Sequence, residues 1–332
     1  MLAKPLQFPA DIPSDYEMLV DEPVYDPAIH LAVDESRQVE TETLADFGYN
    51  KHEIADCPSP IAVGGPFRVL SPEGIRVTTE VLSRLRSTAE SDTGNRAPNY
   101  VAGGVYKSRF LRDLSNCTEL AGRVSNIMGT PLGAHTIPHQ QLYVNFAPED
   151  VSKAVDNWHT DSIDYDIVIL LEEPDTFDGG KFQYFRGTDR EAAEIFGTQT
   201  EELPVGFSDE LPESRVVSAA KTCGGEAVCQ QGAKVVHRAQ KLNKPAERTT
   251  LVISYVPLDV RFKDQNNLER IIEWDHAGTA AELARHCSWR SQARLQNILE
   301  DLPINSDSES VLERLKFAVA DVNKLIELLE AN

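Results

Sequence analysis

The triplet His159-Thr160-Asp161 places an imidazole and a carboxylate two residues apart. On an extended backbone alternate side chains point to the same face, so these two groups would project together. An apolar run from Ile167 to Leu171 follows and predicts a buried strand. One histidine and one carboxylate on a face are two of the three ligands of a 2-His-1-carboxylate facial triad, which holds Fe(II) with coordination positions left open.

The third ligand should be a histidine on a later strand that returns beside the first two. His237 fits this requirement, because it ends the segment 234–237, which contains two valines and predicts a strand. Four other histidines lie in irregular or helical segments and are expected at the surface: His30, His52, His276 and His286.

The remaining two histidines, His135 and His139, are four residues apart, a spacing that suits one face of a helix. Pro138 between them argues against a helix, because its ring removes a backbone donor and clashes with the preceding turn. An extended segment could still turn both rings the same way. With no acidic residue nearby, this pair is expected to be structural or to support the site from outside.

A possible anchor for an anionic ligand follows His237. Arg248 stands at the entry to the strongest apolar strand of the chain, residues 249–256, and shares a face with Thr250. A guanidinium beside a hydroxyl can bind a carboxylate through paired hydrogen bonds. The alternative is a surface ion pair, which contributes little. The apolar residues of the strand favour an arginine at the edge of a pocket.

Taken in order, the metal-ligand motif, the later histidine and Arg248-x-Thr250 resemble the signature of the Fe(II)/2-oxoglutarate-dependent dioxygenases. The similarity includes residues 110–114 and 179–182 and covers about residues 105–257. It is strongest toward the phytanoyl-CoA and prolyl hydroxylase-like branches and toward small-molecule oxygenases of secondary metabolism.

This resemblance implies a double-stranded β-helix (jelly roll) with Fe(II) inside its open end. It assigns His159, Asp161 and His237 to the metal, and Arg248, Thr250 and Tyr143 to 2-oxoglutarate. O2 would be the other co-substrate, with ascorbate in support. Because Asp161 stands where halogenating relatives have a small residue, the resemblance implies hydroxylation, desaturation or oxidative cyclisation. The anionic composition, the low content of basic residues and the absence of a peptide-binding repeat favour a small, amino-acid-like metabolite as the substrate.

The strand and helix patterns that would position these residues predict a mainly β core with α flanks, in one domain covering residues 1–332. An extended arm (1–65) and helical support (66–135) precede the jelly-roll core (136–260), and C-terminal helices (261–332) follow it. Strands are expected at 141–146, 165–173, 181–186, 215–218, 226–230, 234–237 and 249–256. Helices are expected at 72–91, 108–128, 191–196, 268–274, 279–287, 290–299 and 310–329. The apolar stripe of the last helix would pack on the domain or form a homodimer interface.

Composition limits the classes of partner. A net charge of -21 disfavours nucleic acid and anionic membrane surfaces. Five scattered cysteines without a CxxC pair disfavour a disulfide framework or structural zinc, and the start of the sequence lacks the pattern of a secretory signal. A cytoplasmic enzyme with a small-molecule substrate is therefore expected. Two alternatives stay open: a non-catalytic, cupin-like metal-binding jelly roll, and a peptidyl hydroxylase.

Overall fold

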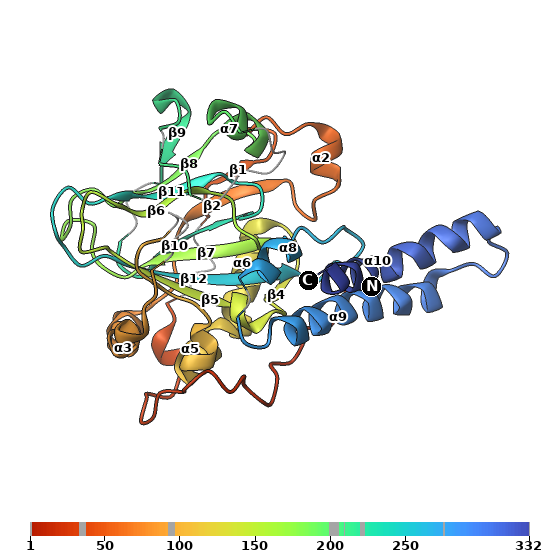
Figure 1. Ribbon diagram of the computed structural model, residues 1–332, viewed down its shortest axis with the longest axis horizontal. Helices are drawn as coiled ribbons and strands as arrows, with labels where there is room; N and C mark the ends of the chain where they lie inside the picture. The colour runs from red at the N-terminus through yellow and green to blue at the C-terminus, as the bar shows by residue number, and fades with distance from the viewer. Residues whose placement is uncertain are drawn as a thin grey trace.

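The computed structural model describes residues 2–32, 38–91, 97–198, 206–208, 210–219, 223–274 and 276–331. Two antiparallel sheets pack against each other, with helices on the outer face of the larger sheet and a helical hairpin at one end (Figure 1). None of the helices in these ranges combines the length and apolar composition needed to cross a bilayer.

The larger sheet has the strand order β1-β2-β10-β7-β12-β5-β3, with β4 paired to β12. Its strands are β1 (Thr41–Thr43), β2 (Ile61–Arg68), β3 (Tyr100–Val101), β4 (Leu132–Ala134), β5 (Leu142–Phe146), β7 (Tyr165–Leu170), β10 (Glu226–Gln230) and β12 (Thr249–Pro257). The smaller sheet has the order β6-β11-β8-β9. Its strands are β6 (Ala154–His159), β8 (Phe182–Phe185), β9 (Val216–Ser218) and β11 (His237–Lys241).

The winding of the chain defines the fold class. From β5 onward the strands pass to the smaller sheet at β6, return to the larger at β7, and continue with β8 and β9 in the smaller sheet. The chain then alternates again through β10, β11 and β12. This alternation between two facing antiparallel sheets is a jelly roll, so the prediction of a jelly-roll core is confirmed.

Burial along the strands explains their sequences. β7 and β12 are buried at nearly every position and are almost continuously apolar, because the smaller sheet covers one face and helices cover the other. β5 alternates instead: Leu142, Val144 and Phe146 are buried in the main core, whereas Tyr143 and Asn145 are only partly buried on the opposite face. That opposite face becomes one wall of the site.

The helices before the core differ from the prediction at two boundaries. α3 (Pro72–Leu85) begins where expected, with the Ser71 hydroxyl accepting the Gly74 N–H at 2.9 Å, but ends before residue 91. The single helix expected over 108–128 is two helices, α5 (Arg109–Ser115) and α6 (Thr118–Met128), and α6 ends at Gly129 with φ of 67°. The short helices are α1 (Pro27–His30), α2 (Lys51–Ala55), α4 (Gly104–Lys107), α7 (Asp189–Ile195), η1 (Arg86–Thr88), η2 (Pro138–Gln140) and η3 (Glu213–Arg215).

The N-terminal arm contributes more than expected, because β1 and β2 lie at one edge of the larger sheet. β2 pairs with β10, far along the sequence, and its Gly64-Gly65-Pro66 segment conceals it from a pattern search. α7 confirms the short helix expected in the acidic segment 190–214, of which residues 199–205 and 209 lie outside the described ranges.

The C-terminal part is α8 (Leu268–Glu273), α9 (Thr279–Asp301) and α10 (Ser308–Ala331). α9 and α10 form a hairpin that projects from the core (Figure 1). The prediction of two helices at 279–287 and 290–299 was wrong, because no glycine or proline interrupts the chain between them and one helix continues. Only part of the apolar stripe of α10 meets the domain: Leu325 is buried, whereas Leu312 and Ile326 are exposed.

Candidate metal centre and co-substrate pocket

The smaller sheet brings the two predicted histidine ligands together. His159 is the last residue of β6 and His237 the first residue of β11, and they are direct partners in the antiparallel register. Asp161 follows β6 in the loop to β7, and ligand atoms of the three side chains all lie within 4.8 Å of one another. The prediction that His237 ends a strand was wrong: a turn at residues 232–234 and two irregular residues lead into β11, which His237 begins.

Backbone hydrogen bonds fix the orientation of both rings. The Nδ1 of His159 lies 2.6 Å from the carbonyl oxygen of Asn157, and the Nδ1 of His237 lies 2.9 Å from that of Val235. A carbonyl oxygen only accepts, so Nδ1 carries the proton in each ring, and in the neutral rings Nε2 presents a lone pair.

These two lone pairs face one carboxylate. The Nε2 of His159 is 3.4 Å from Oδ1 of Asp161, and the Nε2 of His237 is 3.4 Å from Oδ2. Three electron-rich groups around one point repel one another unless a cation lies between them. The donor set therefore fits a divalent metal, and two imidazoles with one carboxylate are the facial set preferred by non-haem Fe(II).

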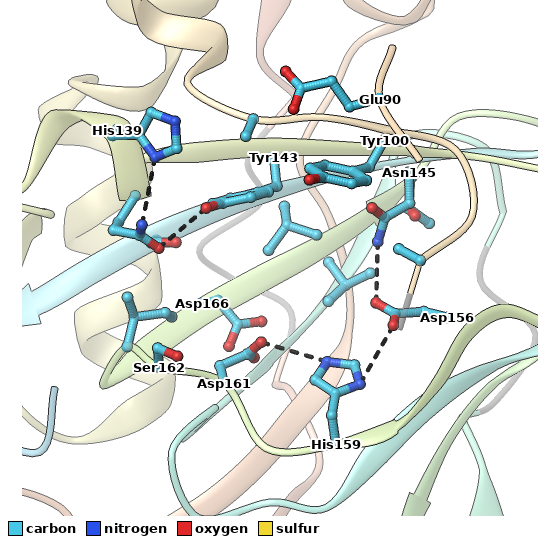
Figure 2. Close-up of a pocket in the computed structure, with 18 of the residues that line it drawn as sticks. Glu90, Tyr100, His139, Tyr143, Asn145, Asp156, His159, Asp161, Ser162 and Asp166 are labelled. Atoms are coloured by element: carbon cyan, nitrogen blue, oxygen red, sulfur yellow. Dashed lines mark hydrogen bonds and ion pairs between the residues drawn. The ribbon is translucent and has the colours of Figure 1, made fainter. Parts of the chain in front are cut away.

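Further polar groups lie beside the predicted ligands. Asp156 lies 3.5 Å from Nδ1 of His159 and accepts a hydrogen bond from Asn145 at 3.3 Å (Figure 2). The amide of Gln230 lies 3.1 Å from Nε2 of His237 and 3.2 Å from the carboxylate of Asp166. Asp156, Gln230 and Asp166 were not predicted from the sequence, although an aspartate within the apolar run of β7 was a usable signal, because burying a charge needs a partner.

Arg248 is buried and forms no ion pair with any described residue within 4.0 Å. Its side chain is 2% exposed, its Nε donates to the carbonyl oxygen of Gly180 at 2.7 Å, and its Nη1 lies 3.4 Å from the Thr250 hydroxyl. Burial lowers the pKa of Arg248 to about 10, against the charges of Glu172 and Asp156, so the group is still a cation at neutral pH. A buried cation with free donors requires an anionic ligand.

The turn expected at residues 178–180 holds this arginine in place. Gly180 has φ of 60°, and a Cβ there would lie 2.9 Å from Cδ of Arg248 and 2.8 Å from Leu242. Only glycine combines this backbone conformation with such a close approach. The turn before β8 therefore packs directly against the Arg248 side chain and fixes its position.

One cavity of about 690 Å³ joins these groups, since its wall includes the three metal-ligand side chains, Arg248 and Thr250. Tyr143 lines the same cavity. Its hydroxyl lies 3.3 Å from Oε1 of Gln140, and its ring contacts His139 and Trp274 edge-on. The assignment of Tyr143 to 2-oxoglutarate stays a prediction.

Four other histidines were expected at the protein surface, and three of them are not exposed there. His52 is exposed, as expected, but His30 and His286 are buried and the His276 side chain is only 8% exposed. His30 packs in a ring cluster with Tyr25 and Phe110. The local sequence pattern did not predict the burial of these rings, because the packing of the N-terminal arm and of α9 on the rest of the fold determines it.

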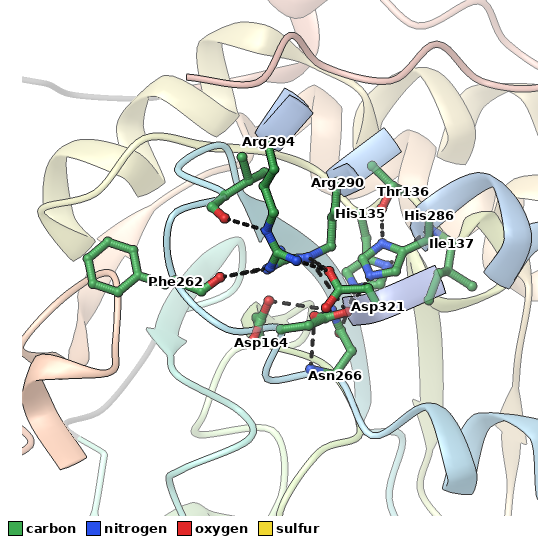
Figure 3. Close-up of polar contacts among 12 residues, drawn as sticks. His135, Thr136, Ile137, Asp164, Phe262, Asn266, His286, Arg290, Arg294 and Asp321 are labelled. Atoms are coloured by element: carbon green, nitrogen blue, oxygen red, sulfur yellow. Dashed lines mark hydrogen bonds and ion pairs between the residues drawn. The ribbon is translucent and has the colours of Figure 1, made fainter. Parts of the chain in front are cut away.

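The segment around Pro138 separates its two histidines. His135 enters a buried polar cluster (Figure 3), where it lies 2.9 Å from Oδ1 of Asn266. His286 of α9 joins the same cluster through Thr136 and Asp264. His139 instead lines the cavity. The structural role expected for this pair therefore fits His135, whereas His139 lies in the wall of the cavity.

No protein-family model matches the sequence, and neither does any curated protein. Among solved structures, the carbocyclase SnoK from nogalamycin biosynthesis, a non-haem α-ketoglutarate-dependent enzyme, is 15% identical (65% of this chain, 86% of that chain, TM-score 0.43). The epimerase SnoN from the same biosynthesis is 14% identical (57% and 75%, TM-score 0.42). EctD from S. alaskensis, solved with 2-oxoglutarate and 5-hydroxyectoine, is 13% identical (70% and 88%, TM-score 0.41). These descriptions name the class that the motifs resemble, and the fold assignment itself rests on strand order.

Proposed function

We propose that the protein is an Fe(II)/2-oxoglutarate-dependent oxygenase that oxidises a C–H bond of a small molecule. The observation that carries this proposal is the buried Arg248, which faces the same cavity as His159, Asp161 and His237. A site that only held a metal would have no use for an unpaired guanidinium in the same cavity.

Each residue has a defined part. His159, Asp161 and His237 would hold Fe(II) on one face and leave its other positions open to the cavity. Arg248 and Thr250 would bind the far carboxylate of 2-oxoglutarate, and the backbone of Gly180 keeps the guanidinium in position. Asp156, beside Nδ1 of His159, would keep that imidazole oriented, and the Val235 carbonyl would orient the ring of His237.

When bound, Fe(II) and 2-oxoglutarate supply O2-dependent oxidative decarboxylation, which yields succinate and CO2 and oxidises the substrate. The chain contributes the binding, the orientation and a walled cavity that limits access of water. Hydroxylation, desaturation and ring closure are all compatible with this donor set, and a substrate mass change of plus one oxygen or minus two hydrogens distinguishes hydroxylation from the others.

The first test measures assembly of the site without turnover. Adding Fe(II) and 2-oxoglutarate under anaerobic conditions should give a weak visible charge-transfer band. His159→Ala should abolish the band because one of three ligands is lost, whereas His52→Ala, at an exposed histidine, should leave it unchanged. A wild-type protein without the band, or a band that survives His159→Ala, would contradict the proposal.

The second test addresses the non-catalytic alternative. Succinate should form from 2-oxoglutarate in the presence of O2 and Fe(II), slowly without substrate and faster when a substrate is added. A protein that retains zinc or nickel tightly and never forms succinate would be a metal-binding jelly roll instead.

A further inference from the structure

The cavity has a second end, away from the metal ligands, where ring side chains gather. His139 and Tyr143 lie across the cavity from His159 and Asp161 (Figure 2). We define the outer subsite as Tyr16, His139, Tyr143, Trp274 and His276, which come from the N-terminal arm, η2, β5 and the α8–α9 connection. No contiguous motif joins these positions, so only the fold brings them together.

The rings of the outer subsite form a stacking surface. His139 and His276 lie parallel, with centroids 3.5 Å apart and planes at 12°. Tyr16 lies 6.1 Å from His139, and Tyr143 meets both His139 and Trp274 edge-on at 6.2 and 6.0 Å. Trp274 is 38% exposed, so its ring stands at the edge of the cavity. Such a surface favours a planar ring inserted among these side chains.

His276 has hydrogen-bonding groups that the protein does not use. Its side chain is 8% exposed, yet neither ring nitrogen forms a hydrogen bond with a described residue. The nearest carboxylate, Glu282, lies 3.6 Å away and is already bonded to the Tyr106 hydroxyl at 2.6 Å and the His139 N–H at 2.9 Å. Buried polar atoms normally find a partner, so a ligand in the cavity is the expected partner of His276.

The charges around the outer subsite indicate the sign of the ligand. Two acidic residues, Asp15 and Glu90, line this end of the cavity, and Glu282 lies behind it against the backbone of His139. Among the described lining residues, Lys107 is the cation at this end, 5.9 Å from the Tyr16 ring. An anion is therefore disfavoured. A cation is also unsupported, because Glu282 is already hydrogen-bonded and Asp15 and Glu90 are exposed to water. Burial, together with His276 and Lys107, holds the pKa of His139 well below its usual range, so this ring is neutral.

We propose that the outer subsite binds an uncharged, planar aromatic part of the substrate and that His276 forms a hydrogen bond to a hydroxyl or keto group on that ring. The inference rests on the proposed function, since it treats the cavity as the substrate site. The reactive C–H bond would then extend toward the metal ligands at the other end.

The test uses matched bicyclic probes on the Fe(II)- and 2-oxoglutarate-loaded protein without O2. Titration calorimetry should show that 2-naphthol binds at least tenfold more tightly than 2-naphthoate, 2-naphthylmethylammonium and decahydro-2-naphthol, which is about 1.4 kcal/mol. These probes differ from 2-naphthol in charge or planarity while keeping a similar size.

Variants separate stacking from hydrogen bonding. His276→Phe keeps a ring but no donor or acceptor, so it should weaken 2-naphthol about tenfold and leave naphthalene unchanged. Trp274→Ala should weaken both probes, Trp274→Phe should restore them, and His52→Ala should affect neither. All variants should keep the charge-transfer band, which shows that the loaded protein is intact.

Four results would overturn the inference: tighter binding of the anion, tighter binding of the ammonium probe, equal binding of the saturated alcohol, or a normal 2-naphthol affinity in His276→Phe. The charge-transfer band distinguishes this failure from that of the proposed function. A normal band without 2-naphthol binding rejects the outer subsite alone. An absent band with selective 2-naphthol binding rejects the oxygenase and leaves an aromatic-ligand site.

Discussion

At the scale of single residues, the site depends on which atom of each side chain is already engaged. His159 and His237 each donate Nδ1–H to the carbonyl two residues earlier, which leaves Nε2 with a lone pair that could bind a metal. Arg248 donates Nε–H to the backbone of Gly180 and an Nη1 hydrogen to Thr250, and the rest of its guanidinium faces the cavity. A hydrogen bond at one atom of each side chain fixes the direction of its ligand-facing atom, so the site is preorganised before a ligand binds.

The first prediction concerns the geometry of the Arg248 side chain. Arg248→Lys keeps a positive charge but loses the planar fork and the Nε bond to Gly180, so KM for 2-oxoglutarate should rise at least tenfold, equivalent to about 1.4 kcal/mol. The change in kcat at saturating 2-oxoglutarate should be much smaller. Steady-state succinate assays measure both constants. Arg76→Lys, at an exposed arginine of α3, is the control, and an unaltered KM in Arg248→Lys would reject the anchor.

At the scale of elements, the α9–α10 hairpin is attached to the core by buried charges. Asp321 of α10 accepts from Nε of Arg290 at 2.7 Å and lies 2.9 Å from Nη1 of Arg294 (Figure 3). Both arginines are almost fully buried and also donate to the carbonyl oxygen of Phe262. The hairpin therefore continues the same polar cluster that holds His135, next to the segment that carries His139 into the cavity.

The second prediction follows from this attachment. Asp321→Ala leaves two buried guanidiniums without their shared carboxylate, so the free energy of unfolding should fall by roughly 3–5 kcal/mol. Urea unfolding followed by circular dichroism measures this change. Asp301→Ala, at an exposed position near the end of α9, should change it by less than about 0.5 kcal/mol. A small loss in Asp321→Ala would show that the hairpin is held by its apolar contacts instead.

At the scale of the whole molecule, a protein with a net charge of -21 keeps several carboxylates inside. Asp164 is buried in the polar cluster, the Asp264 side chain there is only 8% exposed, and the two carboxylates share the amide of Asn266. Burial and the charge of Asp264 raise the pKa of Asp164 to about 8. Arg290 and His286 hold the pKa of Asp264 low despite its burial. One acid is thus protonated and the other charged at neutral pH.

The third prediction is a pH dependence of stability. Between the unfolded pKa of about 3.9 and the folded value, the folded state holds a proton on Asp164 that the unfolded state releases. This contribution is complete below about pH 4, falls by up to about 1.4 kcal/mol per pH unit between about pH 4 and pH 8, and is fully lost above about pH 8.

Unfolding free energies of the wild type should therefore decline from about pH 5 to about pH 8 and level off above it. Asp164→Asn, which carries no titrating proton, should flatten the decline. The exposed Asp150→Asn should not, because hydrogen bonds from Ser152 hold the pKa of Asp150 below its usual range and outside this window. An equally steep decline in Asp164→Asn would assign the effect to other groups.

The sequence by itself singled out residues that the fold brings to one cavity: His159, Asp161, His237 and the Arg248-x-Thr250 pair. Their metal and co-substrate roles stay predictions. Their local signals were sufficient because residue type and alternation along a strand are properties of the chain. Strands with clear apolar patterns, such as β5, β7 and β12, were predicted for the same reason. The jelly roll was implied by the resemblance to the dioxygenase family, and the strand order of the structure confirmed it.

Only the tertiary structure decided the strand pairings and side-chain environments that depend on residues distant in sequence. β2 joined the sheet only through β10, and His286 and His276 became buried only because α9 and the chain before it fold back on the core. A histidine has no fixed preference between surface, polar cluster and cavity, so its neighbours in space set its role. The outer end of the cavity, which the arm and the α8–α9 connection build around η2 and β5, could for that reason not be found in the sequence.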